Sequence, residues 1–214
     1  GPEDIGRFKV DAVANLIQRH QPRAEVMPLR YDVIEHADLL RPVLDDIDVV
    51  VCCVDGVAAR QAMTHLCALA STPAVFACVL DDGALGEIVR LPARDDVGCL
   101  RCLRRSLEHD GSIDPEPSLD LEYGTGTSHR PMTAIAGDLN LMGSLAAKAA
   151  ASAYLESRGH RDQRWAGDHL VVGLRPDTPF EAPFDQGRVL DVTATTAAPP
   201  DPDCPLCSDD RRFD

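Results

Sequence analysis

The sequence predicts an α/β protein with a doubly wound, Rossmann-like and mostly parallel sheet flanked by helices. Residues 47–54 are almost continuously apolar and rich in Val, which is typical of a strand covered by helices on both faces. Residues 74–80 have the same character. Segments of helical composition alternate with such strands over short links, as in doubly wound folds.

The N-terminal third is predicted to form two helices and a strand. Residues 8–20 carry an apolar stripe at helical spacing, and Gln21-Pro22 ends that helix. We expect the stripe to face inward; it consists of Phe8, Ala12, Val13, Leu16 and Ile17. Residues 24–29 alternate like a strand, with Pro28 indicating a sheet edge or the end of the strand. Residues 37–44 predict a short helix interrupted at Pro42.

The central segment continues the alternation. The strand at 47–54 leads into a helix at 56–69, and the strand at 74–80 follows. Asp81-Asp82-Gly83 is a turn signal, so residues 86–91 are predicted to pair nearby as a hairpin. Nucleotide-binding domains of this class start with a strand, a Gly-rich loop and a helix. The sequence lacks this first βα unit, and we expect the chain to begin inside such an architecture.

The C-terminal half combines a long polar segment with a helix and two strands. Residues 104–129 lack periodicity and predict a functional or disordered loop. Pro131 opens an Ala-rich helix that runs to about residue 157, and Gly159 ends it. Residues 169–174 and 188–193 are predicted strands. Residues 195–203 have the composition of an extended linker.

Composition excludes several classes of function. A net charge of −14 argues against nucleic-acid or anionic-membrane binding, and 4% aromatic residues argues against base stacking. The acidic surface suits a basic partner or simply aids solubility. No apolar run reaches the roughly 20 residues of a membrane span, and no signal segment is evident. We therefore expect a cytoplasmic protein.

The eight cysteines fall into two groups. Four lie in apolar segments and are predicted to be buried free thiols: Cys52, Cys53, Cys67 and Cys78. The others form two Cys-x-x-Cys pairs: Cys99 with Cys102, and Cys204 with Cys207. Two such pairs complete a closed tetrahedral zinc site, which would fasten the C-terminal tail to the end of the sheet. The alternatives are two unrelated reduced dithiols or a catalytic zinc, although a catalytic site keeps one position open.

Asp55 follows the buried strand at 47–54 directly. The carboxyl edge of an open α/β sheet is where ligands bind, so Asp55 is a candidate site residue. The alternative is that its side chain only caps the next helix.

These features together resemble the ThiF/MoeB/HesA family of adenylyltransferases, which are related to ubiquitin-activating enzymes. Four features in chain order carry the resemblance, and they span nearly the whole chain. They are the run DIGRFKV at 4–10 entering a helix that ends at Gln21-Pro22, the run DVVVCCVD at 48–55 followed by Arg60, the two Cys-x-x-Cys pairs, and the Ala-rich helix after the polar segment.

The resemblance implies ATP-dependent adenylation of the C-terminal glycine of a ubiquitin-like or sulfur-carrier protein. It implies that Asp55 ligates magnesium and that Lys9 stabilises the phosphates of ATP, with Arg60 as a further site position. It also implies a structural zinc on Cys99, Cys102, Cys204 and Cys207. Residues 1–214 then form one domain, with a crossover loop at 104–129 and a zinc-binding tail at 195–214. Homodimers are expected, since family members pair along the sheet and long helices.

The sequence also departs from the family. The Gly-rich loop, the ribose-binding acid and the upstream arginines and asparagine have no counterpart, and Gly56 replaces the usual Asn. No cysteine lies between Cys102 and Cys204, which suggests adenylation without a thioester step, as in MoeB-like members. The alternative function is a non-catalytic, zinc-stapled scaffold or dimerisation module. A nicotinamide-dependent dehydrogenase has little support, because its fingerprint is absent too.

Overall fold

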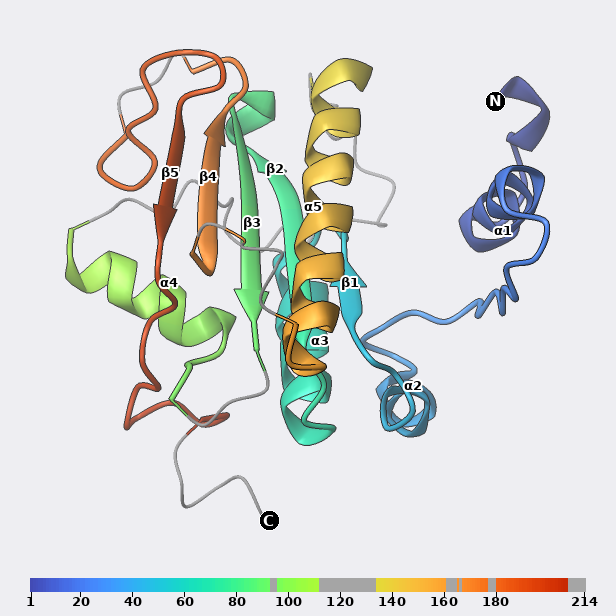
Figure 1. Ribbon diagram of the computed structural model, residues 1–214, viewed down its shortest axis with the longest axis horizontal. Coiled ribbons are helices and arrows are strands. Elements are labelled where there is room, and N and C mark those ends of the chain that lie inside the picture. The colour runs from blue at the N-terminus through green and yellow to red at the C-terminus, as the bar shows by residue number, and fades with distance from the viewer. Residues whose placement is uncertain (93–95, 112–133, 161–164, 166, 177–179, 208–214) are drawn as a thin grey trace.

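A computed structural model shows a five-stranded sheet with helices on both of its faces (Figure 1). It describes residues 1–92, 96–111, 134–160, 165, 167–176 and 180–207. The strands are β1 (Val50–Cys52), β2 (Ala74–Leu80), β3 (Leu85–Leu91), β4 (His169–Gly173) and β5 (Val192–Thr195). The helices are α1 (Lys9–His20), α2 (Ala37–Leu44), α3 (Val57–Leu69), α4 (Leu100–His109) and α5 (Ala136–Ser157), with short 3₁₀ turns η1 (Pro2–Asp4) and η2 (Asp81–Gly83). The predicted α/β class is confirmed.

The strand directions differ from the predicted, mostly parallel sheet. The strand order is β1-β2-β3-β4-β5, and only β1 and β2 run parallel, with Val51 opposite Val75. The other three pairs are antiparallel. A parallel pair needs a long crossover, as α3 provides between β1 and β2. The three-residue turn η2 allows only an antiparallel return from β2 to β3, as the hairpin prediction for residues 86–91 required.

Successive residues of β2 divide the core into two layers. Ala74 and Phe76 pack on the side of α3 and α4, together with Leu66 and Leu103. Val75 and Ala77 pack on the opposite side, against the small residues of α5. Figure 1 shows α5 in front of the sheet and α3 behind it. The resulting α–β–α layering is what buries the near-continuous apolar run of β2 on both faces.

Helix α5 lies close to the sheet because small residues meet at the contact. Ala146 and Ala149 are buried, and Met142 sits over Gly86 of β3. A Cβ at Gly86 would lie 2.2 Å from the Met142 sulfur, so only glycine fits there without a shift. The helix starts at Ala136 and Gly159 follows its end with φ +79°. Pro131, the predicted start, lies outside the described residues.

The N-terminal arm departs most from prediction. Helix α1 is present, but the stripe predicted to face inward is exposed: Phe8 59%, Val13 52%, Leu16 47% and Ile17 38%. Figure 1 shows α1 to one side of the molecule, away from the sheet. Residues 24–29 form no strand, because a strand needs a hydrogen-bonded neighbour and the ladders of the described sheet join only β1 to β5. Arg30 anchors the arm internally, with its Nη2 2.7 Å from Asp11 and its guanidinium over the Phe8 ring.

Three further predictions need correction. Residues 104–109 belong to α4 rather than to a loop, because Leu100, Leu103 and Leu107 pack on the core at helical spacing. The last strand is Val192–Thr195 rather than 188–193. Cys53 is exposed, since β1 is an edge strand and its residues facing α5 are only partly covered, whereas Cys52 and Cys67 are buried as predicted.

Among the described residues, no helix is both long enough and apolar enough to cross a bilayer.

The close contact between α5 and β3 gives a first prediction. Replacing the buried Met142 by alanine should lower the free energy of unfolding by about 2–5 kcal/mol, because it leaves a cavity over Gly86. Leu139, which is 50% exposed on the same helix, is the control, and Leu139→Ala should cost about 0.5 kcal/mol or less. Urea denaturation measures both values. Equal losses would contradict the described packing.

Candidate functional site

Asp55 lies where predicted, between the end of β1 and the start of α3. It is exposed, and its carboxylate makes no hydrogen bond or ion pair with any residue that the structure describes. The N-cap of α3 is Gly56, so Asp55 does not occupy the capping position. The carboxylate therefore projects from the carboxyl edge of the sheet with its oxygens available to a ligand.

Arg60 is held inside the protein beneath Asp55. It lies in the first turns of α3, is 3% exposed, and donates from Nη1 to the Val54 carbonyl oxygen at 3.2 Å. Val54 directly precedes Asp55 in the chain. Arg60 thus braces the backbone that presents Asp55, and its guanidinium is covered rather than open to solvent.

Lys9 is not brought to Asp55. It is the first residue of α1 and is exposed, and α1 lies to one side of the sheet (Figure 1). Of the three residues predicted to act around a nucleotide, the structure places Asp55 and Arg60 on one β–α connection and leaves Lys9 on the arm. The role predicted for each of the three stays a prediction.

The two Cys-x-x-Cys pairs meet in one buried cluster. The sulfur atoms of Cys99, Cys102, Cys204 and Cys207 all lie within 4.8 Å of one another. The Cys99 sulfur is 3.7 Å from that of Cys102 and 3.7 Å from that of Cys204. A tetrahedral metal with bonds of about 2.3 Å to sulfur separates its ligands by about 3.8 Å, so the spacing fits a metal ion and is too long for disulfides.

The surrounding backbone supports thiolates at this cluster. The amide N–H of Cys99 points at the Cys207 sulfur (3.3 Å), and that of Asp201 at the Cys102 sulfur (3.4 Å). The thiols of Cys207 and Cys99 lower the pKa of Cys102 well below the usual thiol value, and the pKa of Cys99 is raised in turn by its hydrogen bond to Cys102. Such N–H donors are the outer contacts that orient thiolates around a metal.

The tail is attached beside the cluster by a backbone hydrogen bond and an ion pair. The Gly98 N–H donates to the Ala198 carbonyl oxygen at 2.8 Å, and Arg105 pairs with Asp201 at 2.9 Å. A Cβ at Gly98 would lie 2.6 Å from the Cys102 Cβ and 2.7 Å from the Pro199 carbonyl oxygen. Glycine is therefore needed where the tail crosses the first Cys-x-x-Cys pair.

A buried charge network on the α4 side of the sheet was not predicted from sequence. Glu87 in the middle of β3 is 2% exposed and receives both terminal nitrogens of Arg104, at 2.6 and 2.5 Å. His169 Nε2 also lies 2.7 Å from Oε1 of Glu87, and the Cys78 thiol donates to Oε2 at 3.6 Å. The sequence feature that could have predicted it is Glu87 itself, because a glutamate inside an apolar strand needs a buried partner for its charge.

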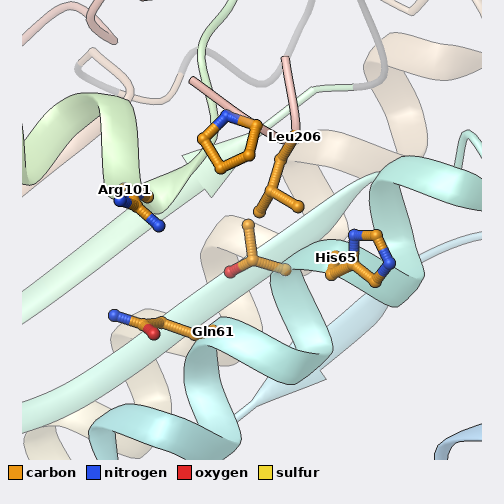
Figure 2. A pocket seen from close by; sticks show the side chains of 6 residues that line it. Gln61, His65, Arg101 and Leu206 are labelled. Atoms are coloured by element: carbon orange, nitrogen blue, oxygen red, sulfur yellow. The ribbon is translucent and has the colours of Figure 1, made fainter. Parts of the chain in front are cut away.

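A pocket lies between α3, α4 and the tail segment that carries Leu206, which also packs against the four-cysteine cluster (Figure 2). In Figure 2, Leu206 points toward α3, with Arg101 of α4 to one side and His65 of α3 to the other. The pocket measures about 200 Å³. Ligand clefts usually measure roughly 300–1,000 Å³, so this hollow is too small for a nucleotide. Its lining residues are Gln61, Thr64, His65, Arg101, Pro205 and Leu206.

The environment of Glu87 predicts a loss of stability in acid. Burial favours a higher pKa, but the charge of Arg104 and the hydrogen bond from His169 outweigh it and hold the pKa well below the usual value of about 4.3. A lowered folded-state pKa stabilises the fold above the unfolded-state pKa, and this contribution is lost as the pH falls below it.

The difference in unfolding free energy between wild type and Glu87→Gln should therefore shrink as the pH falls from about 7 to about 3.5. Its limiting slope is about 1.4 kcal/mol per pH unit below the unfolded-state pKa. Denaturant titrations at each pH measure this difference, with Asp45→Asn as a surface control. A difference that stays constant over this range would show that Glu87 does not titrate as described.

Several solved structures share this fold. E. coli MccB superposes with a TM-score of 0.63 at 14% identity, covering 98% of this chain and 52% of MccB. The Microcin C7 biosynthetic enzyme MccB in complex with N-formylated MccA gives 0.62 at 14% identity, covering 97% and 54%. PaaA gives 0.51 at 13% identity, covering 84% and 55%. At these identities the likeness shows the fold alone, and the chain spans about half the length of these structures.

The family comparison is more specific. No protein of curated function matches the sequence significantly. The ThiF family matches residues 1–156, a range that holds Lys9, Asp55, Arg60 and the first Cys-x-x-Cys pair. This match covers well over half of the 214 residues and agrees with the fold of the superposed structures. The chain belongs to the ThiF family.

Proposed function

We propose that the protein containing this chain activates the C-terminal carboxylate of a small protein or peptide by ATP-dependent adenylation. The observation that carries the proposal is the exposed carboxylate of Asp55. It stands at the carboxyl end of β1, braced by Arg60, within the range matched to the ThiF family. Ligands of open α/β sheets bind at this edge.

The chemistry suits these residues. In adenylation a carboxylate oxygen attacks the α-phosphorus of ATP, and the bond to the bridging oxygen breaks to release pyrophosphate. Both reactants are negatively charged, so their repulsion must be reduced. Asp55 would hold magnesium, which when bound neutralises charge on the phosphates. Lys9 would add a cation once the arm lies against the nucleotide, and Arg60 holds the Asp55 backbone in place.

We also propose zinc as the metal of the four-cysteine cluster. Four thiolates at tetrahedral spacing form a closed donor set with no position left for a substrate. The role is structural. Cys204 and Cys207 of the tail are joined to Cys99 and Cys102 at the start of α4, so the metal would fix both segments together.

The proposed partner is a polypeptide with a free C-terminus. Structures of MccB contain MccA, in one case N-formylated. By analogy the substrate here is a ubiquitin-like or sulfur-carrier protein ending in glycine, or a peptide. No cysteine is available between Cys102 and Cys204 for a thioester, so the product is the acyl adenylate itself. A homodimer is part of this proposal.

A second candidate function is a non-catalytic scaffold in which the metal-stapled fold serves as a docking or dimerisation module. The position of the arm favours it, because Lys9 on α1 lies away from the β1–α3 connection (Figure 1). Gly56, in place of the family's Asn, also removes one polar contact.

ATP–pyrophosphate exchange separates the two functions. The full-length protein should exchange labelled pyrophosphate into ATP when a carrier ending in Gly-Gly or a substrate peptide is present. Asp55→Asn should reduce exchange by about 10²- to 10³-fold, because one stabilising contact to the developing charge is lost. Asp46→Asn, which changes an exposed aspartate at the other end of β1, should leave exchange unchanged.

The scaffold function predicts no exchange with any such carrier. Equal losses in Asp55→Asn and Asp46→Asn would show that Asp55 has no special role. Circular dichroism and metal content of each variant confirm that the fold is intact.

A further inference from the structure

The buried carboxylate of Glu87 is a contact point between three elements. Arg104 reaches it from α4, His169 from β4 and Cys78 from β2. All of these contacts lie on the α4 side of the sheet, and Glu87 and His169 are 2% and 1% exposed. A buried carboxylate is tolerated only while its charged partner stays in place.

Arg104 is tied to the four-cysteine cluster through the backbone of α4. Cys102 and Arg104 lie two positions apart on the same short helix, and both are buried. The Cys102 sulfur is part of the cluster, while the Arg104 guanidinium makes a bidentate ion pair with Glu87. A helical segment moves as a unit, so the position of Cys102 and the position of Arg104 depend on each other.

On its other side, α4 reaches the connection that carries Asp55. Leu103 of α4 packs in the same apolar cluster as Leu66 of α3, and Val54 packs against that cluster. Arg60 in turn holds the Val54 carbonyl oxygen at 3.2 Å. The contacts therefore run from the cluster into α4, where Arg104 binds Glu87 and Leu103 packs beside Val54, and they end one residue before Asp55.

We propose that Arg104 and Glu87 are positioning residues that couple metal binding at the four-cysteine cluster to the β1–α3 connection. Metal binding fixes the start of α4 and with it the buried ion pair, and the ion pair favours the arrangement of α4 that brings the four sulfurs together. The meaning of this coupling for catalysis rests on the proposed role of Asp55, but the coupling itself does not depend on it.

Zinc affinity tests the proposal, because coupling between two sites is reciprocal. The dissociation constant is measured with the purified protein by competition against a chromogenic chelator. Arg104→Met and Glu87→Gln should each weaken zinc binding by about tenfold, within the usual range of coupling between sites. The double variant Glu87→Gln/Arg104→Met removes the same interaction and should weaken it no further than the single changes.

Two control variants separate coupling from general loss of stability. Met142→Ala destabilises the core on the opposite face of the sheet without touching the network, so its zinc affinity should equal that of wild type. Arg101→Met changes an exposed arginine next to Cys102 on the same helix and should also leave the affinity unchanged. An affinity for Arg104→Met within twofold of wild type, or an equal loss in Met142→Ala, would overturn the proposal.

Hydrogen exchange reports on the far end of the coupling. Removing zinc from the wild type should speed exchange of the first hydrogen-bonded amides of α3, beginning with that of Arg60, by about tenfold. In the double variant, zinc removal should change these amides less than twofold. Equal acceleration in both proteins would overturn the coupling. Neither measurement uses ATP or a carrier protein, so their outcome is independent of whether the protein adenylates a substrate.

Discussion

The meeting of four cysteine sulfurs from two distant parts of the chain is the contact on which the C-terminal half depends. Apart from the β4–β5 pairing and a few hydrogen bonds, the tail is held by weak contacts: most of β5 is exposed, and an exposed ion pair such as Arg105–Asp201 contributes about 1 kcal/mol at most. A cross-link that closes a loop of about 100 residues stabilises a fold by up to about 5 kcal/mol in the chain-entropy model. Joining the tail to α4 therefore outweighs the local contacts that surround the cluster.

The same helix carries one partner of a buried ion pair. Arg104 and Glu87 are both buried, and taking the two charges out of water costs several kcal/mol for each. Such a pair adds little net stability, but it tolerates only one placement of α4 on the sheet. Leu100 and Leu103 pack on the core from the same side, so the apolar contacts and the ion pair specify the same arrangement. Asp55, at the edge of that sheet, makes no hydrogen bond or ion pair with the residues that the structure describes, and it is positioned by the backbone that Arg60 braces.

Local chemistry made much of this architecture predictable. The strand at 74–80, the helix after Asp55 and the two Cys-x-x-Cys pairs follow from apolar runs, helical composition and ligand spacing, and the structure places them as expected. The errors concern contacts between distant segments. The directions of β4 and β5, the exposure of α1 and the pairing of Arg104 with Glu87 all depend on which elements meet in space. A charged run such as residues 104–109 is predicted to be a loop from its composition, and only the packing of Leu107 against the core shows that it is helical.

These observations describe a ThiF-family sheet whose candidate catalytic edge and metal-binding tail are joined through one short helix. The central claim is that the four cysteines bind a structural metal. Zinc-edge X-ray absorption on the purified protein, combined with metal analysis, tests it most directly. The account predicts one zinc per chain with four sulfur neighbours at about 2.3 Å. A protein that folds without metal, or zinc surrounded by nitrogen and oxygen ligands, would contradict it.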